Sequence, residues 1–302
     1  MSDHVHDRGD DGGVVDHGGV RIRYHAHGAG EPAVLLLPPW AIAHSGVWQE
    51  QVPRLCRRHR VVTYDPRGNG GSDRPLDPAA HDPLVLVGDA TAVLDALGIE
   101  RAVVVGNSFG TVLAYLLAAL HPDRVEGAVF VNPSSLNLDG RVDDPFQQAF
   151  ARFDEDLGSD EGWARLNRHS WERDYEGFVR WFVGQAFPER GAGPYRTAGI
   201  AWGLDVTPEE LAATVRGRVG TPPEATAARL RSLAPSITCP TLVIHGQRDP
   251  IAPRHRAETL AALLGSRLVL VDDAGHCPQL TRPDLVAALV EELAAHGRRA
   301  AA

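Results

Sequence analysis

The sequence predicts an α/β fold in which a mostly parallel sheet of about eight strands is covered by helices on both faces. Short, continuously apolar runs recur along the chain, as expected for strands buried on both faces. Helix-like amphipathic segments follow most of these runs, and strand–helix alternation implies right-handed crossovers and a parallel sheet. A long central stretch lacks any convincing buried strand, which indicates a helical insertion.

The expected strands are short, and only the first alternates polar and apolar residues as a half-exposed strand does. The continuous run Ala-Val-Leu-Leu-Leu at 33–37 is typical of the others. The strands are expected at residues 20–26, 33–37, 60–64, 102–105, 127–131, 241–245 and 268–271. The intervening helices are expected at 46–56, 83–97, 109–120, 253–264 and 283–295.

The insertion divides the chain into a core, expected at 14–132 and 236–297, and a helical cap at 133–235. A polar, acidic segment at 1–13 is expected to be a disordered tail. The cap segment is rich in aromatic residues and would lie over the carboxyl ends of the parallel strands, where open α/β sheets bind ligands. We therefore expect the cap to roof a binding site.

Composition excludes several classes of function. A net charge of −9 argues against a nucleic-acid partner and gives no reason to bind an anionic membrane. The chain has no lysine, so lysine Schiff-base chemistry is excluded. No apolar run resembles a signal peptide or a membrane span, and the three scattered cysteines suggest reduced thiols. We expect a cytoplasmic monomer or homodimer whose partner is a small-molecule substrate.

A serine with two glycine neighbours is the sharpest chemical signal in the chain. Residues 106–110 read Gly-Asn-Ser-Phe-Gly and lie between an expected strand and an expected helix, the context that the pattern G-x-S-x-G requires. Gly106 and Gly110 permit a very tight turn, which would present the Ser108 hydroxyl at the edge of the sheet. We therefore predict that Ser108 is a nucleophile.

A serine nucleophile needs a histidine base, and the histidine is usually oriented by a carboxylate. His276 follows the last expected strand in a loop that contains Gly275 and Pro278. Asp249 follows the preceding strand, and the chain order Ser, Asp, His is the one expected on such a sheet. Asp272 and Asp273 are rivals for the acid, but they lie too close to His276 in sequence to reach its ring easily.

These motifs together resemble the α/β-hydrolase superfamily, specifically its members with a helical cap. The resemblance spans about residues 20–295 and includes Asp-Pro-Arg-Gly-Asn-Gly-Gly-Ser at 65–72, similar to the family's D-x-R-G-x-G-x-S loop. It implies acyl chemistry through a Ser108–His276–Asp249 triad, with no metal or organic cofactor. The histidines lack metal-ligand spacing, and residues 68–71 lack the lysine of a phosphate-binding loop.

The chain departs from the family after the third strand, where relatives usually have His-Gly before an oxyanion-hole donor. Here the residues are Pro38, Pro39 and Trp40, and proline has no N–H to donate. The backbone N–H of Trp40 aligns with the family's donor. Phe109, the residue after the nucleophile, would supply the second N–H.

The resemblance leaves the reaction open. Epoxide hydrolases and haloalkane dehalogenases of this fold use an aspartate nucleophile, so Ser108 argues against them. The turn at 106–110 also resembles that of meta-cleavage-product hydrolases, which cut carbon–carbon bonds, although their oxyanion loop is glycine-rich and unlike residues 38–44. Perhydrolases, a biosynthetic tailoring enzyme (acyl transfer, cyclisation or lactone opening) and a non-catalytic ligand-binding protein are further alternatives.

We predict a serine hydrolase that cleaves an ester-type acyl bond in a small, largely apolar molecule. Aromatic side chains commonly line apolar pockets, so aromatic residues of the cap and of the oxyanion loop are the candidates for substrate contact. For His44, capping of its own loop is the alternative role. The expected substrate contacts are Trp40, His44, Trp163, Trp171, Phe178, Trp181, Phe182 and Trp202.

Overall fold

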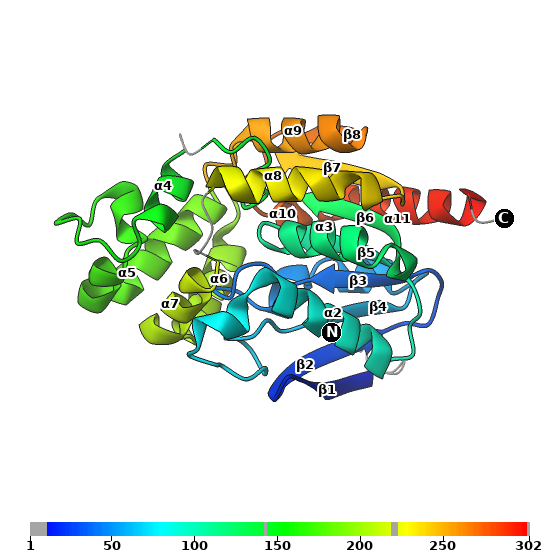
Figure 1. The fold of residues 1–302 in the computed structure, drawn as a ribbon, viewed down its shortest axis with the longest axis horizontal. Helices are drawn as coiled ribbons and strands as arrows, with labels where there is room; N and C mark the ends of the chain where they lie inside the picture. Colours follow the sequence, from blue (N-terminus) through cyan, green and yellow to red (C-terminus); the bar gives the residue numbers. More distant parts are fainter. Residues whose placement is uncertain (1–10, 142–143, 219–222, 301–302) are drawn as a thin grey trace.

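The computed structural model describes residues 11–141, 144–218 and 223–300, and one eight-stranded sheet runs through it (Figure 1). The strand order is β1-β2-β4-β3-β5-β6-β7-β8. The two pairings that involve β2 are antiparallel and the other five are parallel, which confirms the predicted mostly parallel sheet. The strands are β1 (Asp11–His17), β2 (Val20–His27), β3 (Ala33–Leu37), β4 (Val61–Tyr64), β5 (Ala102–Asn107), β6 (Val125–Val131), β7 (Thr241–Gly246) and β8 (Arg267–Val271).

The first strand, β1, was not predicted. Its sequence is polar and mostly exposed, so it lacks the apolar pattern of a buried strand. It pairs with β2 across Gly18 and Gly19, both with positive φ, as a two-residue hairpin turn requires. The prediction of a disordered tail over 1–13 was therefore wrong for residues 11–13, and residues 1–10 lie outside the described part.

Helices cover both faces of the sheet (Figure 1). Helices α2, α3 and α8 contact one another in series, while α1, α10 and α11 form a second group. The segment expected as one helix at 46–56 is two short helices, η1 and α1. The helices beside the sheet are η1 (Ser45–Trp48), α1 (Val52–Leu55), η2 (Pro78–His81), α2 (Pro83–Ala96), α3 (Gly110–Leu120), η3 (Pro122–Arg124), α8 (Pro223–Leu233), η5 (Ala234–Ser236), α9 (Arg254–Leu264), α10 (Pro278–Thr281) and α11 (Pro283–Ala300).

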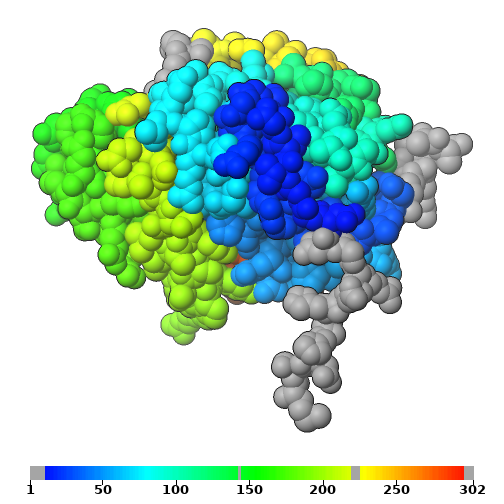
Figure 2. Space-filling model, turned by 90° about the horizontal axis from the view of Figure 1, so that it is seen from below, coloured from blue at the N-terminus to red at the C-terminus, as the bar shows by residue number. Residues whose placement is uncertain are grey.

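A group of helices between β6 and β7 stands at one side of the sheet (Figure 1), and their residues form the green and yellow-green surface at the left of Figure 2. They are α4 (Pro145–Ala151), η4 (Gly162–Arg165), α5 (Arg168–Ala186), α6 (Gly193–Leu204) and α7 (Pro208–Arg216), and we call them the cap helices. Helix α8, which we expected in the same insertion, instead packs on α3, where Tyr115 Oη donates to Leu230 O.

Among the described helices, none has the length and apolar character that a membrane crossing requires.

A buried ion pair fixes the loop after β4. The Arg67 guanidinium donates from Nε and Nη2 to the two oxygens of Asp89, each at 2.7 Å. Their side chains are 3% and 1% exposed, and Arg67 also donates to His17 O of β1. The pair therefore joins the loop at 65–72, helix α2 and the first hairpin.

Removing the carboxylate of Asp89 would leave the buried Arg67 charge without its partner. We expect Asp89→Ala to lower the free energy of unfolding by about 3–5 kcal/mol. Asp95 lies on the same helix and pairs with Arg124, but it is exposed, so Asp95→Ala should cost less than about 1 kcal/mol. Urea unfolding of both variants measures the difference, and equal losses would contradict this assignment.

Candidate functional site

The turn between β5 and α3 holds Ser108 in a conformation that few side chains adopt. Its φ is 56°, in the left-handed region. A Cβ at Gly106 would collide with Gly110 O, and one at Gly110 would lie 2.8 Å from Pro38 O. Glycine at both positions thus lets the backbone close tightly, and Ser108 is held at the carboxyl end of β5.

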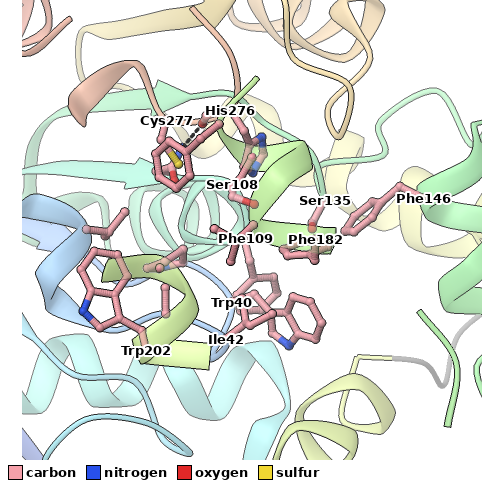
Figure 3. Close-up of a pocket in the computed structure, with 18 of the residues that line it drawn as sticks. Trp40, Ile42, Ser108, Phe109, Ser135, Phe146, Phe182, Trp202, His276 and Cys277 are labelled. Carbon is pink, nitrogen blue, oxygen red and sulfur yellow. Dashed lines mark hydrogen bonds between the residues drawn. The ribbon is translucent and has the colours of Figure 1, made fainter. Parts of the chain in front are cut away.

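Ser108 and His276 line the same cavity (Figure 3), and Asp249 contacts the His276 ring. The Nδ1 atom of His276 is 2.7 Å from Asp249 Oδ2. The hydroxyl of Ser108 hydrogen-bonds with that of Ser134 at 2.9 Å. Within the described part of the chain, no hydrogen bond joins Ser108 Oγ to the His276 ring. The structure thus brings the three predicted residues together, with the serine hydroxyl turned toward Ser134.

The Asp249 carboxylate accepts four hydrogen bonds. Its donors are His276 Nδ1, Asn132 Nδ2 and the backbone N–H groups of Ile251 and Ala252. Burial by itself raises the pKa of Asp249, but the positive charge of His276 and the hydrogen bonds outweigh it. The pKa therefore lies below its ordinary value, and the carboxylate stays ionised at neutral pH.

The two rival aspartates point elsewhere. Asp272 accepts a hydrogen bond from Gln247, and Asp273 pairs with Arg248. Both are exposed, whereas the Asp249 side chain is fully buried against His276. The geometry therefore favours Asp249 as the partner of the histidine.

The loop that carries His276 is fastened from both sides. On the side of the sheet, Asn107 Nδ2 at the end of β5 donates to His276 O at 3.0 Å. From the cap, Ala186 O accepts the His276 N–H at 3.2 Å, and the Glu189 carboxylate accepts the Gly275 N–H. The position of the imidazole consequently depends on the end of α5 as well as on the sheet.

Two residues that line the cavity have a backbone N–H without a partner in the described part of the chain. Trp40 and Phe109 both line the cavity, and neither N–H donates to a described residue. Phe109 precedes the first turn of α3, where helix N–H groups have no partner within the helix. Trp40 is held by its indole, which donates from Nε1 to Thr214 at 2.7 Å. These are the two donors predicted for an oxyanion hole.

The cavity has a volume of about 60 Å³ and a mostly apolar lining. Of the predicted contacts, Trp40, Phe182 and Trp202 line it (Figure 3). Trp163, Trp171, Phe178 and Trp181 are not among its described lining residues, because they pack on other aromatic rings of the cap helices. The cavity is also lined by Pro39, Ile42, Ala43, Val47, Asn107, Ser135, Phe146, Val183, Ala186, Phe187, Gly199, Arg218 and Cys277.

His44 lies outside this lining and serves its own loop. Its Nδ1 accepts the Gly46 N–H at 3.1 Å, which caps η1. Burial lowers the pKa of His44 from its ordinary value, with Asp65 acting in the opposite direction. The ring is neutral at pH 7 and acts as an acceptor, so the expectation of a substrate contact is not supported by its position.

Residues able to hold a metal are not clustered in the described part of the chain. No group of three or more histidine, cysteine, aspartate or glutamate side chains there is placed to ligate one ion. The glycine-rich loop at 68–71 turns its backbone inward, since Asp65 accepts the Gly71 N–H at 2.8 Å. That N–H is therefore taken up within the protein.

Sequence reasoning missed Asn132, Ser134, Glu189 and Arg218, all of which lie at or beside the site. Asn132 directly follows β6, and its place at the carboxyl end of a parallel strand was a usable signal. Ser134 follows it by two residues. Glu189 and Arg218 come from the helical segment, where no pattern in the sequence indicates which side chains face the core.

Comparison with known proteins identifies relatives of this chain by sequence and by structure. The sequence profile described as alpha/beta hydrolase fold matches residues 30–283. The chain is 31% identical to 2-hydroxymuconate semialdehyde hydrolase of Pseudomonas sp. strain CF600, over 94% of this chain and 93% of that protein. The solved structure of Est816, an N-acyl homoserine lactone degrading enzyme, aligns with a TM-score of 0.73 and 26% identity, covering 93% and 99% of the two chains. A hydrolase from Pseudomonas aeruginosa PA01 aligns with a TM-score of 0.75 and 26% identity, covering 94% and 98%.

Asn132 should stabilise the ends of three strands. Its amide donates to Asp249 and Gly275 O, and its oxygen accepts the Gly246 N–H. Asn132→Ala removes these three buried hydrogen bonds, so we expect the free energy of unfolding to fall by about 1–3 kcal/mol. Gln247→Ala, which removes only an exposed contact, should change it by less than about 0.5 kcal/mol. Urea unfolding tests this, and a wild-type value for Asn132→Ala would refute it.

Proposed function

Because this chain belongs to the alpha/beta hydrolase fold family, we propose that it is a serine hydrolase that cleaves an ester-type acyl bond in a small molecule. The observation that carries the proposal is the His276–Asp249 pair, which faces the cavity of a serine held at φ 56°. These are the groups that nucleophilic acyl transfer requires: a nucleophile, a base and an acid that orients the base.

In the proposed reaction, the Ser108 hydroxyl turns from Ser134 toward the His276 ring and attacks the acyl carbon. His276 Nε2 takes the hydroxyl proton, and the ionised Asp249 stabilises the imidazolium through Nδ1. The N–H groups of Trp40 and Phe109 donate to the oxygen that becomes negative. His276 then protonates the leaving group. In the second half of the reaction His276 takes a proton from water, which attacks the acyl carbon, and then returns the proton to Ser108 Oγ as the carboxylic acid leaves.

The cavity supports a substrate with an apolar acyl part. Trp40, Phe182 and Trp202 give it aromatic walls, and each methylene buried there adds up to about 0.8 kcal/mol of binding. Medium-chain or aromatic acyl groups should therefore be preferred to acetate. The structural likeness to Est816, a lactone-degrading enzyme, favours ring-closed esters as members of this class.

Hydrolysis of a carbon–carbon bond by the same triad is the second candidate. The likeness to 2-hydroxymuconate semialdehyde hydrolase over nearly the whole chain favours it. Against it stands the loop at 38–40, where two prolines precede the Trp40 donor. The cap helices would roof either site, since α5 and α6 supply Phe182 and Trp202 to the cavity.

Ser108→Ala should abolish ester hydrolysis while the protein stays folded. Loss of the nucleophile costs on the order of 10⁴–10⁶ in turnover. A fluorophosphonate probe should label the wild type but not the variant, as seen by intact-mass spectrometry. Ser135→Ala, another serine of the cavity, is the matched control and should keep activity within about tenfold. If the wild type neither reacts with the probe nor hydrolyses a panel of esters, the chain is a binding protein instead.

Asp249→Asn keeps the shape of the side chain but favours the wrong imidazole tautomer. We expect kcat to fall by about 10⁴ on a verified substrate, as in serine proteases. Asp272→Asn should be nearly silent, because Asp272 is exposed and bonded to Gln247. A steady-state comparison at pH 7 decides between them, and a critical Asp272 would overturn the assignment.

A further inference from the structure

Arg218 is a positively charged side chain at the wall of the Ser108 cavity. It lies two residues after α7, and its backbone N–H is bonded to Val215 O. Its guanidinium carbon is 3.5 Å from the centroid of the Phe109 ring and 5.9 Å from that of Trp40. The charge therefore rests on the side chains of the two residues whose N–H groups are the proposed oxyanion donors.

Arg218 is partly exposed, with its Nε atom buried, and it differs from the fully buried arginines of the described residues, which have a carboxylate partner. Arg67 is paired with Asp89 and Arg256 with Asp144. Among the described residues, no ion pair or side-chain hydrogen bond joins the Arg218 guanidinium to another group, and its buried Nε has no partner. Burial lowers the pKa of Arg218 well below its ordinary value, as expected for a cation removed from water without a counterion.

The ring contacts do not replace a counterion. The attraction of a cation to an aromatic face is weaker than the cost of taking a guanidinium out of water. No aspartate or glutamate is among the described residues that line the Ser108 cavity. A bound molecule that carries a carboxylate would therefore supply the partner that no described ion pair gives the Arg218 guanidinium.

A second, larger hollow meets the Ser108 cavity at Arg218. This groove has a volume of about 390 Å³ and shares Phe109, Ser135, Phe146 and Arg218 with the Ser108 cavity. Its described lining includes one acidic residue, Asp82, and a second arginine, Arg229. A molecule that reaches Ser108 along the groove would pass the guanidinium and could leave an anionic group there.

We propose that Arg218 binds a carboxylate carried by the substrate, so that the substrate class is an ester with an apolar body and one acidic end. This inference rests on the proposed function. A guanidinium binds a carboxylate through two parallel N–H···O bonds, which fixes orientation as well as charge. The acidic end would then set the position of the acyl carbon against Ser108.

The test uses pairs of esters that differ only in the charge of one end. On the acyl side the pair is the 4-nitrophenyl monoester of glutarate and the matching glutaramate ester. On the leaving-group side it is the acetyl ester of 4-hydroxybenzoate and that of 4-hydroxybenzamide. The wild type should prefer the anionic member of at least one pair. Arg218→Gln should lower kcat/KM for that member on the order of 100-fold, mainly through KM, and leave its neutral partner within a few-fold.

Two further variants separate charge from geometry. Arg218→Lys keeps the charge without the planar fork and should recover part of the loss. Arg229→Gln, the exposed arginine of the groove, should change neither member by more than a few-fold. Arg218→Gln should also melt at or above the wild-type temperature, since no internal ion pair is lost. The proposal is overturned if the wild type prefers the neutral member of both pairs, or if Arg218→Gln slows both members equally.

A binding readout keeps this inference distinct from the proposed reaction. In the Ser108→Ala background, monomethyl glutarate, which has one carboxylate, should raise the melting temperature, and methyl glutaramate, which has none, should not; addition of Arg218→Gln should remove the effect. If no ester is hydrolysed but monomethyl glutarate still stabilises through Arg218, the anion site stands and the esterase proposal fails. If esters are hydrolysed through Ser108 without charge preference or stabilisation, the anion site alone is refuted.

Discussion

The hydrogen bonds around the Asp249 carboxylate hold the site together. They join the ends of three neighbouring strands: Asn132 follows β6, Asp249 follows β7 and His276 follows β8. A carboxylate buried without donors would take up a proton, and its hold on the imidazole would be lost. The four donors around Asp249 prevent this, so the electrostatics of the site depend on the register of the sheet.

The cap helices are part of this arrangement as well as a cover over it. Trp40 packs its indole ring on Phe182 of α5, at 5.4 Å between centroids, and donates to Thr214 of α7. The His276 N–H is bonded to Ala186 O at the end of α5. One helix therefore contacts both the loop of the proposed oxyanion donor and the loop of the proposed base. A displacement of α5 would disturb both loops together, which links access to the cavity with the geometry of the reacting groups.

Charge is distributed unevenly over the interior. Where the fold needs a buried cation, as at Arg67 between α2 and the first hairpin, a carboxylate meets it with two hydrogen bonds. At Arg218 the described residues supply aromatic faces and no ion pair. The first arrangement stabilises the folded chain, whereas the second costs stability unless a ligand completes it. This contrast separates a structural arginine from one that is placed for binding.

The sequence by itself determined the sheet and the residues at its strand ends. Continuous apolar runs mark buried strands, and a glycine-flanked serine or a loop histidine after such a run is fixed at the carboxyl edge by local chain geometry. Ser108, Asp249 and His276 could be placed in this way, whereas the exposed strand β1 left no apolar pattern to find. Only the tertiary structure decided which cap aromatics reach the cavity, that α8 packs on α3, and that Asn132, Glu189 and Arg218 surround the site. The spacing of aromatic residues along a cap helix is the same whether their rings face the cap's own core or the cavity, so the sequence does not distinguish the two. The partner of a charged side chain comes from residues far away in the sequence, so the lack of a partner at Arg218 appears only when the chain is folded.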